Sequence, residues 1–109
     1  MTSWEKKAQG ESGDMAYYVI FDVTIHDLPK YQEYMAKIKP VIEAAGGRYL
    51  VRGGAHMVIE GDWKPTRLVI FEFPSLAAAQ SFYVSPDYQP LKALRQEAST
   101  ASIVGVEGV

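Results

Sequence analysis

The chain has 109 residues, of which 48% are hydrophobic and 22% charged, a size and composition that fit one globular domain. Its formal net charge of −2 and its pI of about 5.6 provide no basic surface for phosphates, which argues against a nucleic-acid partner. The absence of cysteine excludes disulfides, thiolate catalysis and thiolate metal sites.

The first 14 residues differ in composition from the rest of the chain. Between Thr2 and Asp14, Trp4 is the only large apolar side chain. Such a segment buries too little surface to offset the entropy of ordering it, so we expect residues 1–14 to be a disordered extension or tag before a single domain, residues 15–109. The start lacks the apolar core of a secretion signal, and no later run is long enough to span a membrane, which predicts a cytoplasmic protein without a membrane partner.

The first predicted elements are a strand at Tyr17–Ile25 and a helix at Leu28–Ala45. Both faces of the strand are largely apolar, with Asp22 as the exception. In the helix, apolar side chains recur at steps of three and four residues, and Asp27 is placed to cap the first turn. Gly46-Gly47 ends this helix, because glycine readily adopts the left-handed conformation of a helix C-terminus.

The middle of the chain predicts three strand segments. Arg48–Arg52 and His56–Glu60 are two strand pieces separated by a bulge or tight bend at Gly53-Gly54. A turn at Gly61–Pro65 then leads into a further strand at Arg67–Phe73.

The last part of the chain predicts a helical region and a closing strand. Ser75 caps a helix at Leu76–Tyr83, and Ser85-Pro86-Asp87 starts a second helical stretch, since these residue types favour a helix N-terminus. The closing strand is Ala101–Val106.

The order of these elements, βαββαβ, predicts the ferredoxin-like fold. This is an α+β fold in which a four-stranded antiparallel sheet carries helices on one face. The strands Tyr17–Ile25 and Leu68–Phe73 look apolar on both faces, so the face without helices would expose a large apolar patch. Packing two copies through this face removes the patch, and we therefore expect a homodimer.

Four sequence motifs resemble those of a known family. They are Gly46-Gly47-Arg48-Tyr49-Leu50-Val51-Arg52-Gly53-Gly54, Glu60-Gly61-Asp62-Trp63, Phe71-Glu72-Phe73-Pro74-Ser75, and Tyr83-x-Ser85-Pro86-x-Tyr88-Gln89 followed by Arg95. With these motifs in this order over nearly all of Met15–Gly108, the chain resembles the domain of unknown function 1330 family. The resemblance implies the dimeric α+β barrel superfamily, in which two ferredoxin-like sheets pack into one barrel.

The resemblance implies little about chemistry. Relatives in the superfamily include cofactor-free monooxygenases of antibiotic biosynthesis, muconolactone isomerase and haem-degrading or haem-binding proteins, but the family itself has no established reaction. The resemblance therefore implies a fold and a dimer, with only a loose suggestion of small-molecule chemistry, because one fold supports many functions.

Two acidic residues inside apolar strands, Asp22 and Glu72, are the first candidate site. Their strands are adjacent in the ferredoxin-like order, and Arg52 and Arg67 are available as counter-charges. In one interpretation, a buried carboxylate with a shifted pKa acts as an acid or base, or orients an arginine on a substrate. In the other, the charges form a structural ion-pair network in or beside the dimer interface. Both interpretations remain open.

The second candidate is a small-molecule pocket between the sheet and the helices. Arg52, Tyr83, Tyr88 and Arg95 offer stacking surfaces and bidentate donors for an anionic aromatic ligand. The alternative is that the tyrosines belong to the core, that Ser85 is only a helix cap, and that Arg95 forms a surface or intersubunit ion pair.

The two histidines do not indicate a metal site. His26 and His56 lie far apart in the sequence, with no carboxylate at metal-ligand spacing, so we expect no metal and no cofactor. His56 is a candidate general base because the ordinary pKa of histidine is near 6.5.

Two hypotheses of function follow. In the first, the protein is a homodimer of unknown function that binds a small organic ligand through Arg52, Tyr83, Tyr88 and Arg95. The alternative is a cofactor-independent monooxygenase-like or isomerase-like enzyme that acts on a small aromatic or lactone-like substrate, with His56 and Glu72 as catalytic residues. The sequence holds no complete catalytic constellation, so whether the protein is an enzyme stays open.

Overall fold

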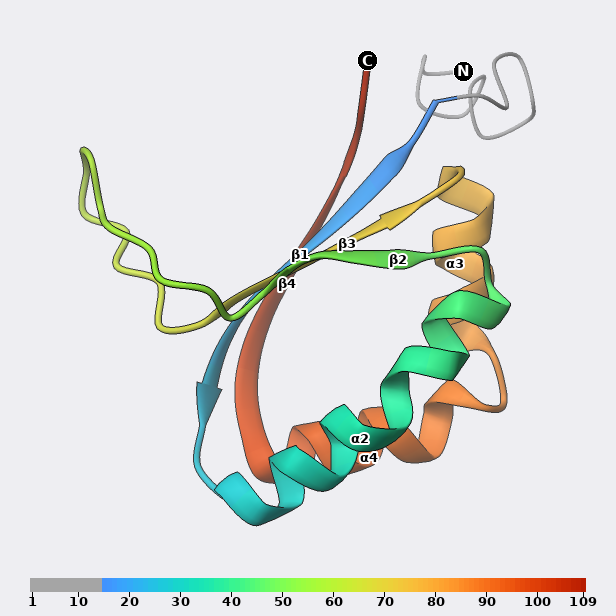
Figure 1. Cartoon of the computed structure of the whole chain (residues 1–109), viewed down its shortest axis with the longest axis horizontal. Helices are drawn as coiled ribbons and strands as arrows, with labels where there is room; N and C mark the ends of the chain where they lie inside the picture. The colour runs from blue at the N-terminus through green and yellow to red at the C-terminus, as the bar shows by residue number, and fades with distance from the viewer. Residues whose placement is uncertain (1–14) are drawn as a thin grey trace.

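The computed structural model of the protein describes residues 15–109, which form a sheet of four strands with three helices on one face (Figure 1). The elements in chain order are β1 (Tyr17–Ile25), α2 (Leu28–Ala44), β2 (Arg48–Arg52), β3 (Leu68–Phe73), α3 (Leu76–Val84), α4 (Tyr88–Ala98) and β4 (Ser99–Glu107). The predicted α+β, ferredoxin-like fold is confirmed. The disorder predicted for residues 1–14 lies outside the described residues.

The sheet has the strand order β2-β3-β1-β4, and every neighbouring pair is antiparallel. The central strands β1 and β3 pair Tyr18 with Glu72 and Asp22 with Leu68. Asp22 and Glu72 therefore share a face of the sheet but lie four positions apart along the strands, from position 18 to position 22.

Local sequence determines where the helices begin and end. Asp27 and Ser75 accept hydrogen bonds from backbone N–H groups three residues later, at 3.2 and 3.1 Å, so both predicted caps are confirmed. The helix α2 continues through Pro40. After it, Gly47 lies so close to β3 that an added Cβ would stand 2.6 Å from the Phe73 ring. This close approach allows the chain to turn directly from α2 into β2.

The core lies between the helices and the inner face of the sheet. A fully buried large apolar side chain typically contributes about 1.5–3 kcal/mol to folding, so the following residues supply much of the stability. Large buried apolar side chains include Phe21, Phe71 and Phe73 of the sheet and Tyr31, Tyr34, Ile38, Ile42, Phe82 and Tyr88 of the helices. In the region that the structure describes, no helix is long and apolar enough to cross a membrane.

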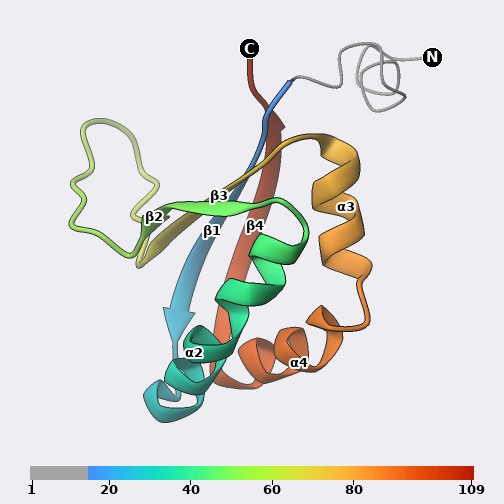
Figure 2. The ribbon, with the colours of Figure 1, turned by 45° about the vertical axis from the view of Figure 1, so that its right-hand side comes forward.

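One predicted strand is wrong. His56–Glu60 is not a strand; it belongs to a long loop, residues 53–66, which we call the arm. The arm leaves the sheet on the side opposite to the helices (Figures 1 and 2). Its apolar side chains have no neighbouring strand to pair with, and Met57 and Ile59 are 80% and 88% exposed. The chain bends at Gly53, where φ is +72, as expected for the glycine pair, and β2 carries a further bulge between Tyr49 and Val51.

Candidate functional site

An open groove lies between α3 and the strands β1 and β4, on the helix-covered side of the sheet. Its volume is about 640 Å³. The side chains that line it are mostly apolar: Tyr17, Val19, Phe21, Leu76, Ala77, Ala79, Gln80, Ser81, Phe82, Tyr83 and Val84, together with Gly105. The Tyr17 ring occupies the space that a side chain at position 105 would need. A Cβ added to Gly105 would stand 2.5 Å from the Tyr17 hydroxyl oxygen. This glycine therefore lets the Tyr17 ring lie across β4 at the edge of the groove.

Of the predicted ligand-binding residues, Tyr83 is the one that lines the groove. Its side chain is 39% exposed, and the ammonium of Lys92 lies 4.7 Å from the centre of its ring. Ser85 has a structural role between α3 and α4. Its hydroxyl donates to the Phe82 carbonyl at 2.8 Å and accepts from the Tyr88 N–H at 3.3 Å.

A second group of polar side chains lies between the sheet, α2 and α4, with Arg52 exposed at its margin, and we call it the arginine–tyrosine cluster. Its members are Arg52, Arg67 and Arg95 with Tyr31, Tyr34, Tyr49 and Tyr88. The predicted ligand-binding residues Arg52, Tyr88 and Arg95 are thus brought together here.

The α4 side of the cluster is deeply buried. Arg95 is only 3% exposed, and its guanidinium carbon lies 5.4 Å from the centre of the Phe21 ring. The Tyr88 side chain is fully buried, with Arg95 and Tyr34 beside its hydroxyl but no hydrogen bond of good geometry to either. Because Phe21 also lines the groove, its ring separates the groove from the cluster.

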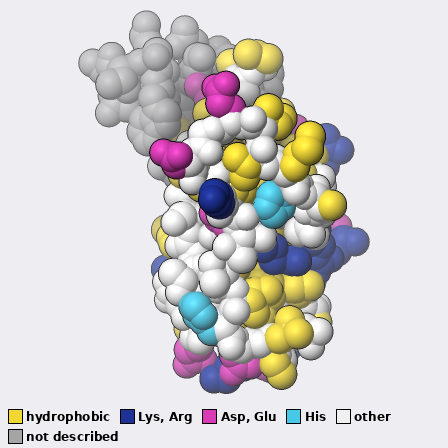
Figure 3. All heavy atoms as spheres, turned by 90° about the vertical axis from the view of Figure 1, so that its left-hand side faces the viewer, with side chains coloured by type: hydrophobic (Ala, Val, Ile, Leu, Met, Phe, Trp, Pro, Cys, Tyr) yellow, Lys and Arg dark blue, Asp and Glu magenta, His cyan; other side chains and the backbone are white. Residues whose placement is uncertain are grey.

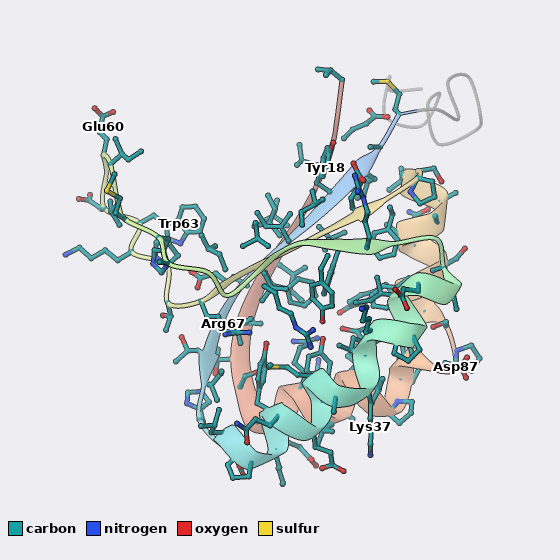
Figure 4. The ribbon with its side chains drawn as sticks, in the orientation of Figure 1. Tyr18, Lys37, Glu60, Trp63, Arg67 and Asp87 are labelled. Atoms are coloured by element: carbon teal, nitrogen blue, oxygen red, sulfur yellow. The ribbon has the colours of Figure 1, made fainter. Side chains whose placement is uncertain are left out.

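The other two arginines approach the cluster from the open ends of β2 and β3. Arg52 donates a hydrogen bond to the Met35 carbonyl at 3.0 Å, and its guanidinium carbon lies 4.5 Å from the centre of the Tyr49 ring. Arg67 points a guanidinium nitrogen at the Met35 sulfur, 3.7 Å away. Arg67 lies at the base of the arm, beside the space between sheet and helices (Figure 4).

Three tyrosines of the cluster, Tyr34, Tyr49 and Tyr88, are neutral at physiological pH. Burial raises the pKa of Tyr34, Tyr49 and Tyr88 above the ordinary value, although neighbouring arginines oppose the increase. Their hydroxyl groups therefore remain hydrogen-bond donors, and no phenolate neutralises the guanidinium charges.

Glu72 and Asp22 lie on the opposite, helix-free face of the sheet, and both are satisfied within the chain. Glu72 Oε1 accepts from Arg48 Nε at 2.6 Å, and this contact holds the pKa of Glu72 below its usual value. Asp22 accepts from the Thr66 N–H at 2.9 Å and from Trp63 Nε1 at 3.0 Å, and the backbone contact with Thr66 is the main reason why its pKa is also lowered. The counter-charges predicted for this pair, Arg52 and Arg67, are instead in the cluster.

His56 lies in the arm and does not line the groove. Its Nε2 is 2.9 Å from the Pro65 carbonyl oxygen, a contact within the arm. His26 contacts the Thr100 hydroxyl at 2.7 Å at the far end of β1. Residues 15–109 contain no group of three or more His, Cys, Asp or Glu side chains arranged to hold a metal ion.

Comparison with known families gives a decisive match. Residues 16–109 match a family described as a domain of unknown function, DUF1330. The chain belongs to the DUF1330 family. No curated protein matches it.

Solved structures place the DUF1330 chain among proteins of the same architecture. RPA0582 from Rhodopseudomonas palustris, a protein of unknown function, is 18% identical with a TM-score of 0.72, over 100% of this chain and 94% of its own. SnoaB from Streptomyces nogalater, a cofactor-independent oxygenase, is 12% identical with a TM-score of 0.54, over 85% and 91%. A protein of unknown function from Bacteroides thetaiotaomicron, a possible oxidoreductase, is 8% identical with a TM-score of 0.54, over 88% and 99%. At these identities the likeness establishes the ferredoxin-like α+β fold and nothing further.

Sequence reasoning about this DUF1330 chain missed the tyrosines of α2 and β2 and misplaced Arg67. The strand period of two contained the signal for Arg67, because that period puts it on the same face as the buried Val69, Phe71 and Phe73. The helical period contained the signal for Tyr34, because it lies three residues after Tyr31 and four before Ile38, on the buried face of α2.

Proposed function

We propose that the protein binds a small, largely apolar molecule in the groove between α3 and the strands β1 and β4. The observation that carries this proposal is the groove itself, whose volume of about 640 Å³ is in the range of sites for small ligands. The aromatic rings of Phe21, Phe82 and Tyr83 in its wall favour a ligand with a flat ring.

The lining favours binding over catalysis. No Asp, Glu, His, Lys or Arg among the described residues lines the groove, so a general acid or base would have to be a tyrosine or belong to the ligand. The predicted catalytic residues His56 and Glu72 lie in the arm and on the helix-free face. The alternative of a cofactor-independent oxygenase or isomerase is supported by the fold of SnoaB, and its test is oxygen uptake with the ligand that the groove selects.

The binding proposal is tested with N-phenyl-1-naphthylamine, an uncharged dye that fluoresces in apolar surroundings. We expect saturable fluorescence with the wild-type chain. Ala77→Trp places an indole in the groove and should weaken dye binding about tenfold or more, since the bulk competes for the same space. Ala36→Trp, on the exposed side of α2, is the matched control and should bind the dye as the wild type does. Equal dye binding by both variants, or none by the wild type, would contradict the proposal.

We also infer that two copies pack through the helix-free face of the sheet. This face carries partly exposed apolar side chains from three strands: Tyr18 and Ile20 of β1, Leu68 and Ile70 of β3, and Val104 and Val106 of β4. The two carboxylates of this face, Glu72 and Asp22, already have partners in Arg48 and in the arm. A second copy that covers the face would therefore leave neither carboxylate without a partner. A cytoplasmic site of action, suggested by the cysteine-free sequence, belongs to the same proposal.

The arm supports the proposed dimer. It extends past the helix-free face, with Glu60 at its tip, while Trp63 lies nearer the sheet and donates to Asp22 (Figure 4). Figure 3 looks onto the side from which the arm projects, and hydrophobic side chains lie in both its upper and its lower part, with Lys and Arg side chains between them. An arm that is fixed at its base and exposes Met57 and Ile59 is suited to closing over a second copy.

A further inference from the structure

Three buried polar atoms in residues 15–109 have no hydrogen-bond partner, and all three belong to the arginine–tyrosine cluster. They are Arg67 Nε, Tyr88 Oη and Arg95 Nε. A buried donor without a partner typically costs about 1–3 kcal/mol, and more when the group is charged. The Tyr88 hydroxyl has Arg95 and Tyr34 beside it, so Arg67 Nε and Arg95 Nε are the two donors that the chain itself leaves without a partner. These two nitrogens indicate that a group from outside the chain completes the cluster.

The charge of the cluster points to an anion as the missing partner. The cluster holds three guanidinium groups, and the ion pairs Lys30–Glu97, Lys37–Glu33 and Arg48–Glu72 of the described chain involve none of them. The neutral tyrosines beside them donate hydrogen bonds but bring no negative charge. Arg95 is buried and Arg67 half-buried, whereas Arg52 is exposed. An uncompensated buried charge is strongly unfavourable, so a bound anion would relieve the charge of Arg95 and the unpaired donors of Arg67 and Arg95.

The cluster has an entrance for such an anion at the free edge of β2. The enclosed space beside Arg52, Arg67 and three of the tyrosines has a volume of only about 10 Å³, close to that of one water-sized group. It adjoins a surface hollow of about 290 Å³, with which it shares Tyr49 and Arg52. Lys39 and Arg48 also line the hollow, with Glu43 as its acidic member, so the entrance is positively charged.

We propose that the arginine–tyrosine cluster binds the carboxylate of a small planar organic acid, which enters through the hollow at the β2 edge. On entry, Arg52 leaves the Met35 carbonyl and pairs with the acid, which opens the enclosed space. A planar carboxylate matches the forked donors of guanidinium groups, and the tyrosine rings provide flat surfaces for an attached ring. This site is separate from the groove, since Phe21 is the single described residue that lines both spaces.

The test compares benzoate with its uncharged analogue benzamide and with inorganic phosphate, by isothermal titration calorimetry in a low-chloride buffer. We expect one benzoate per chain, bound about 10- to 100-fold more tightly than benzamide. The reason is that arginine forms stronger hydrogen bonds with a charged carboxylate than with a neutral amide. Equal binding of benzoate and benzamide, or no binding of either, overturns the proposal. Phosphate binding as tight as that of benzoate also overturns it, because the cluster would then be a site for inorganic anions.

Variants separate recognition from a merely structural role. Arg95→Met and, independently, Arg67→Met should each weaken benzoate binding about tenfold or more. Lys37→Met, which removes an exposed cation of α2 that points away from the sheet (Figure 4), should leave it unchanged. Without benzoate, Arg95→Met should melt at a higher temperature than the wild type, because an uncompensated buried charge has been replaced by an apolar side chain.

The outcomes distinguish this proposal from that of the groove. If Arg95→Met melts at a lower temperature and both arginine variants keep full benzoate affinity, the arginines are structural and the proposal fails. Ala77→Trp should bind benzoate like the wild type, and Arg95→Met should still bind N-phenyl-1-naphthylamine. Loss of benzoate binding in Ala77→Trp would place the acid in the groove and overturn the assignment to the cluster.

Discussion

The two faces of the sheet differ in whether the chain supplies hydrogen-bond partners for their charged groups. On the helix-free face, Asp22 and Glu72 each have good hydrogen-bond partners within the chain. On the helix-covered face, Arg95 is buried and Arg67 half-buried, yet each keeps a guanidinium nitrogen without a partner. The residues with satisfied charges lie on the surface that we assign to a second copy, and those with unsatisfied charges lie where we assign a ligand.

This difference teaches that burial alone does not identify a functional site. Glu72 stands inside an apolar strand and looks catalytic in the sequence, but its neighbours explain it completely. Arg95 stands in an ordinary amphipathic helix, and its neighbours leave it unexplained. The useful criterion is whether the chain itself supplies the partners that a polar group requires.

The largest expected effect concerns the helix-free face. Ile70→Glu places a carboxylate at the centre of this face, opposite Ile20 of β1. We expect the dimer to weaken about 100- to 1,000-fold, because an unpaired charge buried at an interface typically costs several kcal/mol. Light scattering coupled to size-exclusion chromatography over a dilution series measures this change.

The control for this variant is Leu28→Glu, at the start of α2, where the side chain is already 54% exposed. It should leave the dimer intact. Dissociation of both variants, or of neither, would show that the helix-free face is not the surface through which copies associate.

A smaller effect is expected at the base of the arm, where two glycines can be compared directly. Gly53 has φ +72, and an added Cβ would collide with the Arg67 guanidinium, whereas a Cβ on Gly54 would meet nothing within 4 Å. Gly53→Ala should lower the free energy of unfolding by about 1–3 kcal/mol through backbone strain and displacement of Arg67. Gly54→Ala should change it little. Urea denaturation of both variants measures the difference, and equal effects would mean that Arg67 is not held as described.

The smallest effect concerns the Glu72–Arg48 pair. The folded-state pKa of Glu72 is lowered, so ionised Glu72 contributes stability above its unfolded pKa, and that stability is lost as the pH falls through the folded pKa. Glu72→Gln cannot titrate. The wild type should therefore have a slightly higher Tm than this variant at pH 7. The advantage should shrink as the pH falls below the ordinary pKa of glutamate and vanish once the pH has passed the lowered folded-state pKa. A Tm difference at pH 3 as large as that at pH 7 would contradict the assigned ion pair.

Much of the fold could be predicted from the sequence because its signals are local. The caps at Asp27 and Ser75, the apolar period of α2 and the alternation in β1 each depend on residues a few positions apart. The strand prediction for His56–Glu60 was wrong for the same reason, because it too rested on local signals. The apolar side chains of this segment satisfy the local pattern of a strand, but no neighbouring strand pairs with it within the described chain.

The candidate site could be predicted only in part, because it depends on contacts between distant segments. The sequence pointed to Arg52, Tyr88 and Arg95 as ligand-binding residues, and the fold brings these three into one cluster. It did not indicate that Tyr34 joins them, or that Arg95 lacks a carboxylate partner. Both facts depend on how α2 packs against α4. Their roles in binding, and the catalytic roles suggested for His56 and Glu72, stay predictions.

Native mass spectrometry of the wild-type chain with benzoate tests most directly the claim that the two faces serve different partners. We predict a species of twice the 12.1 kDa chain mass that retains one benzoate per chain and retains no benzamide under the same conditions. A species of one chain mass would contradict the role given to the helix-free face. A dimer that keeps both compounds equally, or neither, would contradict the role given to the arginine–tyrosine cluster.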